Sequence, residues 1–213
     1  MLEKRIPIVS TRGCPNRCTF CSIQLVMGHP FRTRSPENVL QELEYWYKRG
    51  YDTFEFSDDN FTFNMPRAEK ICDLIIGSGM KLKLIFGNGL RADRVNKNLL
   101  NKLKKAGTFW IAYSLESSDP HSLELLKKDL TLEQLKESVK ETKELGVKIE
   151  FILNTHGHPD HTIEDAFIKC QTNARLGIHE LDLHRLKENS NIITPYLNVQ
   201  AEPVKADFAF KDG

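Results

Sequence analysis

The sequence predicts an α/β fold, an open barrel of six βα units, on three observations. Apolar runs rich in β-branched and aromatic residues alternate along the chain with segments of helical spacing. Glycines stand at the ends of several predicted helices, where a left-handed cap favours them. Six strands fit before residue 186, which is too few for a closed eight-unit barrel. Alternation of this kind implies parallel pairing with right-handed crossovers.

The predicted strands and helices follow in order. The strands are expected at residues 6–9, 53–56, 82–86, 109–113, 147–153 and 178–183, and a helix is expected after each of the first five. Ser35 before Pro36, and later Thr131, have the form of helix N-caps. The glycines expected at helix ends are Gly50, Gly107, Gly146 and Gly177.

The length of 213 residues suggests one domain. We expect residues 1–186 to form it and residues 187–213 to be a partial C-terminal extension without a clear helix. No linker rich in Gly, Ser or Pro marks a second domain. No further domain that would bind cobalamin, a second cluster or the substrate is evident.

Charge and hydropathy exclude several classes. The chain has 30 Lys+Arg against 29 Asp+Glu, so we expect no broad nucleic-acid or lipid surface. No apolar run approaches the roughly 18–20 residues that span a bilayer, and the N-terminus has no apolar core of a signal peptide. A cytoplasmic protein is expected.

Five cysteines are the informative feature of the composition. Their odd number argues against a disulfide framework. Cys14, Cys18 and Cys21 fall within eight residues, whereas Cys72 and Cys170 stand alone and are expected to be buried in helices. Three thiols this close usually bind a metal. An iron–sulfur cluster is favoured over zinc, because zinc normally takes a fourth protein ligand that is missing here.

Polar residues follow each predicted strand. Because the active sites of parallel α/β folds lie at the carboxyl ends of the strands, these residues are expected to converge on one face. After strands two to six they are Asp58, Asp59 and Asn60; Asn88 and Arg91; Glu116 and Ser117; His156, His158, Asp160 and His161; and His184 and Arg185.

The cysteine motif C-x3-C-x-Φ-C, with Phe20 as the aromatic residue, resembles the signature of radical S-adenosylmethionine (SAM) enzymes. The resemblance is closest to the cobalamin-dependent and methylthiotransferase-like subgroup and covers nearly the whole chain. Further similar segments occur in the family's order at residues 56–61, 114–117, 127–135, 157–165 and 194–196. In the fifth-strand loop His161 stands where the family usually has an acidic residue.

The resemblance implies an open (β/α)6 partial TIM barrel of the radical SAM type. It further implies that a [4Fe-4S] cluster on Cys14, Cys18 and Cys21 reductively cleaves S-adenosyl-L-methionine to a 5′-deoxyadenosyl radical, which abstracts hydrogen from an unknown substrate. A reductant such as flavodoxin or ferredoxin is expected as a partner, and cobalamin only if another domain supplies it.

The resemblance also implies roles for further residues. Phe20 would lie against the adenine, and Ser57, Asp58, Asp59 and Asn60 would approach the methionine amino group. Glu116, counted with the cysteines as catalytic, would contact the ribose or the methionine. Asn88 and Arg91 are candidates for the methionine carboxylate.

Simpler interpretations stay open for some of these residues. Residues 58–60 could form a polar turn, Glu116 could pair with a lysine, and Arg91 could be a solvated structural charge.

The pattern H-x-H-x-D-H at residues 156–161 is typical of metallo-β-lactamase-like zinc hydrolases, the first alternative function. That fold needs antiparallel strands upstream, whereas βα units are predicted here. The second alternative is a non-catalytic iron–sulfur protein. A substrate-facing role of His156 or His158 is a hypothesis that rests on their position after a strand.

Overall fold

The computed structural model describes residues 5–28, 30–189 and 202–211. The chain divides into two compact units, Met1–Ser114 and Leu115–Gly213. The six predicted strands correspond to β1, β4, β5, β6, β7 and β8, and the described strands form no closed barrel. The α/β class and the open arrangement are therefore as predicted.

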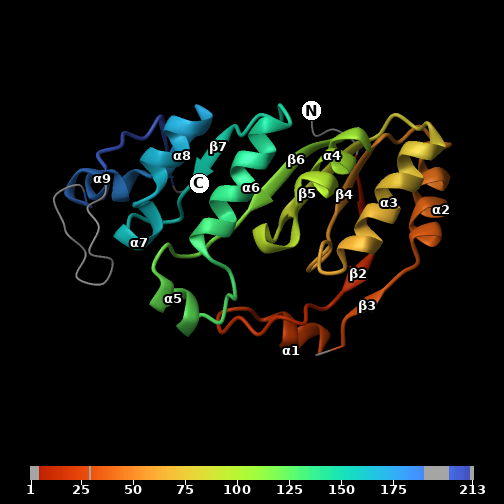
Figure 1. The fold of residues 1–213 in the computed structure, drawn as a ribbon, viewed down its shortest axis with the longest axis horizontal. Helices are drawn as coiled ribbons and strands as arrows, with labels where there is room; N and C mark the ends of the chain where they lie inside the picture. Colours follow the sequence, from red (N-terminus) through yellow and green to blue (C-terminus); the bar gives the residue numbers. More distant parts are fainter. Residues whose placement is uncertain (1–4, 29, 190–201, 212–213) are drawn as a thin grey trace. The chain divides into compact units, whose positions relative to one another are not determined.

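The first unit is built on a parallel sheet with the strand order β1-β4-β5-β6. Helices α2 and α3 lie side by side, and so do α3 and α4 (Figure 1). The short strands β2 and β3 pair antiparallel on either side of the cysteine segment, a pairing that the sequence did not predict. The elements are β1 (Arg5–Ile8), β2 (Thr11–Arg12), α1 (Ile23–Met27), β3 (Arg32–Thr33), α2 (Pro36–Tyr47), β4 (Thr53–Phe56), α3 (Met65–Ser78), β5 (Lys83–Leu90), the 3-10 turn η1 (Ala92–Arg94), α4 (Lys97–Lys105) and β6 (Thr108–Tyr113).

Side-chain caps start the three longer helices of this unit, α2, α3 and α4. The Ser35 side chain accepts a hydrogen bond from the Asn38 amide, and Pro36 occupies the first turn, as predicted. Asn64 and Asn96 cap α3 and α4 in the same way. Each cap satisfies a backbone donor that the first turn leaves without a partner.

A phenylalanine cluster fixes the turn that follows β4. Phe56 and Phe61 are both buried, and their ring centroids lie 5.0 Å apart. Phe86 on β5 stacks on Phe56 at 5.1 Å. Burial of each ring contributes about 1.5–3 kcal/mol. The cluster therefore anchors both ends of residues 57–60, which belong to the candidate site.

The second unit contains a parallel sheet with the order β7-β8-β9. Thr131 and Gln134 form a capping box at the start of α6, which confirms Thr131 as an N-cap. Leu176, Ile178 and Leu186 form a buried cluster. The elements are α5 (Pro120–Leu125), α6 (Leu132–Glu144), β7 (Phe151–Leu153), α7 (Pro159–Thr162), α8 (Asp165–Thr172), β8 (Arg175–His179), the 3-10 turn η2 (Glu180–Asp182), α9 (Leu183–Asn189) and β9 (Phe208–Phe210).

The prediction for the sixth strand was wrong in its bounds. The strand is β8, Arg175–His179, and the chain then turns through η2 into α9. Gly177 lies inside β8 and not at a helix end, because the Phe208 ring packs against it; an added Cβ would be 2.4 Å from that ring. The left-handed cap after α8 is Asn173, with φ of 55°. The other three predicted glycine caps have positive φ, as expected.

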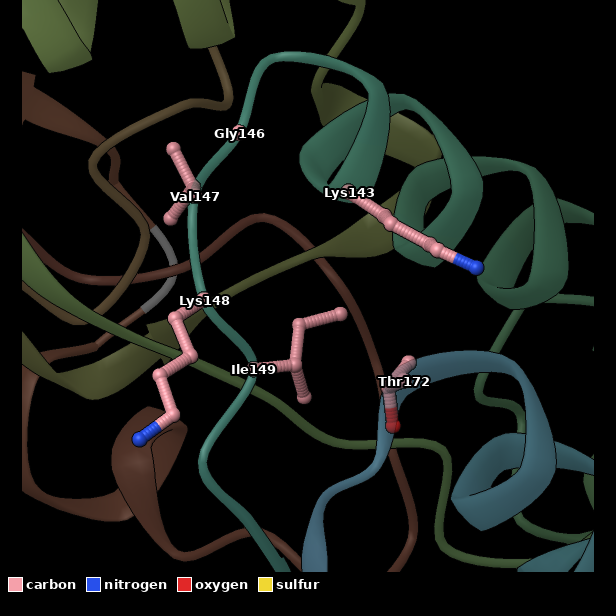
Figure 2. A pocket seen from close by; sticks show the side chains of 6 residues that line it. All are labelled: Lys143, Gly146, Val147, Lys148, Ile149 and Thr172. Carbon is pink, nitrogen blue, oxygen red and sulfur yellow. The ribbon is translucent and has the colours of Figure 1, made fainter.

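The fifth strand is shorter than predicted, because β7 begins only at Phe151. Figure 2 shows Lys148 and Ile149 on opposite sides of the chain before it, as in an extended segment. These residues border a cavity of about 210 Å³, together with Lys143, Gly146, Val147 and Thr172. The cavity is at the amino end of β7, the end opposite to the loops that are expected to carry the site.

Further expectations from the sequence can be compared with the structure. Asn88 lies within β5, which continues to Leu90, and not in the loop after it. Helix α9 runs to Asn189, so the segment after Leu186 does begin as a helix, and it contains His184 and Arg185. Cys72 is buried in α3 as expected, whereas Cys170 on α8 is exposed. Residues 194–196, the last of the segments that resemble the family, lie outside the described residues. None of the described helices is long and apolar enough to cross a membrane.

Candidate functional site

The three clustered cysteines lie on the segment between β2 and α1. Cys14 and Cys18 are half-buried and Cys21 is exposed. Gly13, directly before Cys14, has φ of +83°, and an added Cβ would be 2.7 Å from the Pro30 carbonyl oxygen. Only glycine tolerates both this conformation and this close approach. The entry of the chain into the cysteine segment is therefore tightly constrained.

Asp58 connects the turn after β4 to the residues that precede the cysteines. Its Oδ1 accepts hydrogen bonds from the amides of Ser10 at 2.5 Å and Thr11 at 2.8 Å, and its Oδ2 accepts one from the Ser10 hydroxyl at 2.5 Å. Burial raises the pKa of Asp58, and these hydrogen bonds and the nearby Arg67 guanidinium oppose the rise. Asp58 is thus engaged with the protein itself at both oxygens.

Arg67 on α3 was not predicted as a site residue. Its Nη2 donates to the Ser10 carbonyl oxygen at 2.9 Å, and its Nε donates to the Arg34 carbonyl oxygen, also at 2.9 Å. The side chain is buried, and burial lowers its pKa while Asp58 raises it. An arginine in the first turns of a helix carries no signal in the sequence that would distinguish it from a solvated one.

The next two residues of the turn contact the cysteine segment further along. Asp59 Oδ2 accepts a hydrogen bond from the Gly13 amide at 2.7 Å. Asn60 is buried, and its Nδ2 donates to Cys14 Sγ at 3.4 Å. Residues 58, 59 and 60 therefore meet the cysteine segment in order, so they form more than a polar turn that caps the next helix.

Asn88 and Arg91 lie at the end of β5 in the same unit. Asn88 Nδ2 donates to the Asp58 carbonyl oxygen at 3.5 Å. Arg91 pairs with Asp93 at 2.8 Å, and its side chain is only 13% exposed. With its amide oxygen facing Arg91, Asn16 of the cysteine segment accepts from Nη1 at 2.5 Å and from Nε at 3.0 Å. Arg91 is therefore not the solvated charge of the simpler interpretation.

Glu116 belongs to the second unit and lies in a strained segment. Its φ is +78°, and its carboxylate accepts a hydrogen bond from Lys128 Nζ at 2.8 Å. The Lys128 side chain is 8% exposed, and its neighbours Lys127 and Asp129 also have positive φ. Such conformations cost of order 1–3 kcal/mol each, and they cluster at functional sites. Glu116 thus forms the lysine pair that the simpler interpretation allowed, while its contact with the ribose or the methionine stays a prediction.

The histidine loop gathers three imidazoles in the second unit. The ring centroids lie 4.6 Å apart for His156 and His158 and 4.2 Å apart for His156 and His161. Asp160 accepts a hydrogen bond from the Ser117 hydroxyl at 2.8 Å. Burial lowers the pKa of His161, helped by the two other histidines and opposed by Asp160 and Glu116.

Among the described residues, no three His, Cys, Asp or Glu side chains form a ready-made metal site, either in the histidine loop or in the cysteine segment. The donor set of the cysteine segment nevertheless suits an iron–sulfur cluster. It consists of three thiols within eight residues, none of them buried, in a segment of irregular structure. The histidine loop follows a parallel strand, which is not the setting that the zinc hydrolase alternative requires.

The fold and the cysteine segment together define a parallel α/β core with a three-thiol site beyond its first strand. Comparison with known families shows that residues 8–170 match the radical SAM superfamily. The chain therefore belongs to the radical SAM superfamily, a superfamily of enzymes, as the resemblance predicted. The zinc hydrolase alternative is not favoured.

Individual relatives agree with this assignment. The chain is 33% identical over 161 residues to an uncharacterized methyltransferase of Pyrococcus horikoshii, covering 74% of this chain and 34% of that protein. It is 30% identical over 144 residues to cytidylyl-2-hydroxyethylphosphonate methyltransferase of Streptomyces wedmorensis, covering 67% of this chain and 27% of that protein. The chain thus spans about a third or less of the length of these relatives.

A solved structure supports the fold independently. It is the radical SAM methyltransferase TsrM from Kitasatospora setae, with cobalamin and a [4Fe-4S] cluster bound. The TM-score is 0.68 at 18% identity, over 81% of this chain and 33% of that chain. At this identity the likeness shows the fold alone.

Proposed function

We propose that this chain is the catalytic core of a radical SAM enzyme in which Cys14, Cys18 and Cys21 hold a [4Fe-4S] cluster. The observation that carries the proposal is the C-x3-C-x-Φ-C segment beyond β1, contacted in order by the turn after β4. Three thiolates on four irons leave one iron for an exogenous ligand. When bound, the cluster and SAM would supply reductive cleavage of a carbon–sulfur bond and abstraction of hydrogen from the substrate.

In this proposal some residues of the first unit contact SAM and others hold the cysteine segment in place. Phe20 is 53% exposed beside the thiols and is proposed to lie against the adenine. Asp58 and Asp59 hold the cysteine segment through the hydrogen bonds described above. Ser57 and Asn60 remain in the stretch proposed to approach the methionine amino group.

Further proposed contacts of SAM are oriented by ion pairs. Asn88 and Arg91 stay the proposed contacts of the methionine carboxylate, and Arg91 is oriented by its ion pair with Asp93. Glu116 is the proposed ribose or methionine contact, oriented by Lys128. A carboxylate held by a buried ammonium has few accessible orientations, which suits a residue that must receive a ligand hydroxyl or ammonium group.

For the whole protein we propose methyl transfer to a substrate not yet identified, because several relatives are named methyltransferases. Cobalamin would then come from another domain. We also propose a one-electron reductant such as flavodoxin or ferredoxin and a cytoplasmic location, where thiols stay reduced.

Anaerobic reconstitution with iron and sulfide, followed by dithionite and SAM, tests the proposal. We expect visible cluster absorbance and 5′-deoxyadenosine from the native chain, and neither from Cys18→Ala. Cys170→Ala is the matched control, because Cys170 is exposed on α8 and lies outside the motif. A cluster without deoxyadenosine would indicate the non-catalytic iron–sulfur alternative, and zinc without sulfide would indicate the hydrolase.

A further inference from the structure

The amide of Asn60 is directed at a sulfur and not at open space. Its Nδ2 lies 3.4 Å from Cys14 Sγ, within the range of an N–H···S hydrogen bond. Asn60 is only 4% exposed, so this donor is largely removed from water. In a low-dielectric environment a hydrogen bond of this kind has a stronger electrostatic effect than it has in water.

Both partners of this hydrogen bond are held by independent anchors. On the donor side, Asn60 directly precedes Phe61, whose ring packs against Phe56 and Phe86. On the acceptor side, Cys14 directly follows Gly13, whose amide donates to Asp59. The residues next to both partners are therefore held by the aromatic cluster and by Asp59, which fixes the backbone on either side of the contact.

A hydrogen bond to a cluster sulfur changes the energy of the cluster's two oxidation states unequally. An added electron increases the negative charge on the sulfur ligands, so the N–H···S bond strengthens on reduction. Hydrogen bonds to the sulfurs are accordingly among the features that set iron–sulfur reduction potentials.

We propose that Asn60 is a positioning residue that tunes the cluster through Cys14, raising its reduction potential and so favouring its reduced form. The inference rests on the proposed function, because it requires a cluster on Cys14. It assigns to Asn60 a role toward the sulfur, in addition to any contact with SAM.

The test is an anaerobic redox titration of the iron–sulfur signal, by electron paramagnetic resonance, on the reconstituted chain without SAM. Native chain is compared with Asn60→Ala, which removes the donor, and Asn60→Asp, which keeps the size but places an acceptor against the sulfur. Thr62→Val is the matched control: Thr62 is fully buried on the same turn, and its hydroxyl has no hydrogen-bond partner among the described residues.

We expect the midpoint potential to become more negative in Asn60→Ala, and more negative still in Asn60→Asp, with Thr62→Val at the native value. Equal potentials in all four proteins, at equal iron and sulfide content, would overturn the inference. Failure of both Asn60 variants to load a cluster that Thr62→Val loads would also overturn it, since Asn60 would then be a structural support. Absence of a cluster in the native chain would instead refute the proposed function.

Discussion

Asp58 joins the turn after β4 to the start of the cysteine segment, and its replacement tests how that segment is held. In Asp58→Ala the amides of Ser10 and Thr11 lose their acceptor, and both residues are almost completely buried. An unsatisfied buried donor costs about 1–3 kcal/mol, so the two amides together cost about 2–6 kcal/mol. That is a large part of the roughly 5–15 kcal/mol by which a domain of ordinary stability is folded.

Asp58→Asn separates the lost hydrogen bonds from the lost charge. The asparagine oxygen still accepts from both amides, and a neutral group avoids the desolvation that raises the pKa of Asp58. We expect a loss of about 1–2 kcal/mol at most. Asp59→Ala is the control, because Asp59 is half-buried and accepts from the Gly13 amide; it should cost about 1 kcal/mol.

The measurement is the free energy of unfolding of the purified chain in urea, with circular dichroism as the probe of unfolding. Cluster content after reconstitution is measured on the same proteins, and Asp58→Ala should show a reduced content. An unfolding free energy of Asp58→Ala equal to that of Asp58→Asn would refute the reasoning, because it would mean that the two amides do not depend on this carboxylate.

Three further predictions concern the second unit. Burial raises the pKa of Asp165 from 3.8 to about 7. The folded state therefore binds this proton more tightly than the unfolded state, and the free energy of unfolding falls as the pH rises between these two values. Asp165→Asn should remove this pH-dependent loss of stability, which is of order 4 kcal/mol. The free energy of unfolding in denaturant at pH 4 and pH 8 measures it. A variant with the same pH dependence as the native chain would contradict the prediction. Gly177→Ala places a methyl group 2.4 Å from the Phe208 ring and should cost about 1–3 kcal/mol, visible as a lower Tm; an unaltered Tm would mean that the ring moves freely. The pKa of His161 should lie below 6.5, and it should rise in His156→Gln because the charge of the neighbouring imidazole is removed. Titration by NMR measures this pKa. An equal His161 pKa in both proteins would argue against contact between the two rings.

The location of the candidate site could be predicted from the sequence because it depends on spacing and strand order. The three cysteines follow β1 and residues 58–60 follow β4, and the carboxyl ends of parallel neighbours meet at one edge. The partners within the site could not be predicted. Asp58 binds Ser10, 48 positions away, because β1 and β4 pair in the register Ile8↔Phe56, which brings the residues two positions beyond each strand together.

Arg67 shows the same limit from the other direction. Its side chain is buried against Ser10 and Asp58 only because α3 packs close to the start of the cysteine segment. Local sequence contains no record of that packing. The predicted bounds of the sixth strand were wrong for a similar reason. Gly177 lies within that strand because it packs against Phe208 of β9, which is 31 positions further along the chain.

The sequence by itself determined the family, the α/β class, the three cysteines proposed as cluster ligands, and the starts of α2 and α6. Each of these depends on residues that are close together in the chain: a motif, a hydrophobic period or a cap. Only the tertiary structure decided which atoms Asp58, Asn60 and Arg67 contact, how Glu116 is strained against Lys128, and where the fifth and sixth strands begin. Those features depend on strand register and on side chains far apart in the sequence, which meet only when the sheet and its helices have formed.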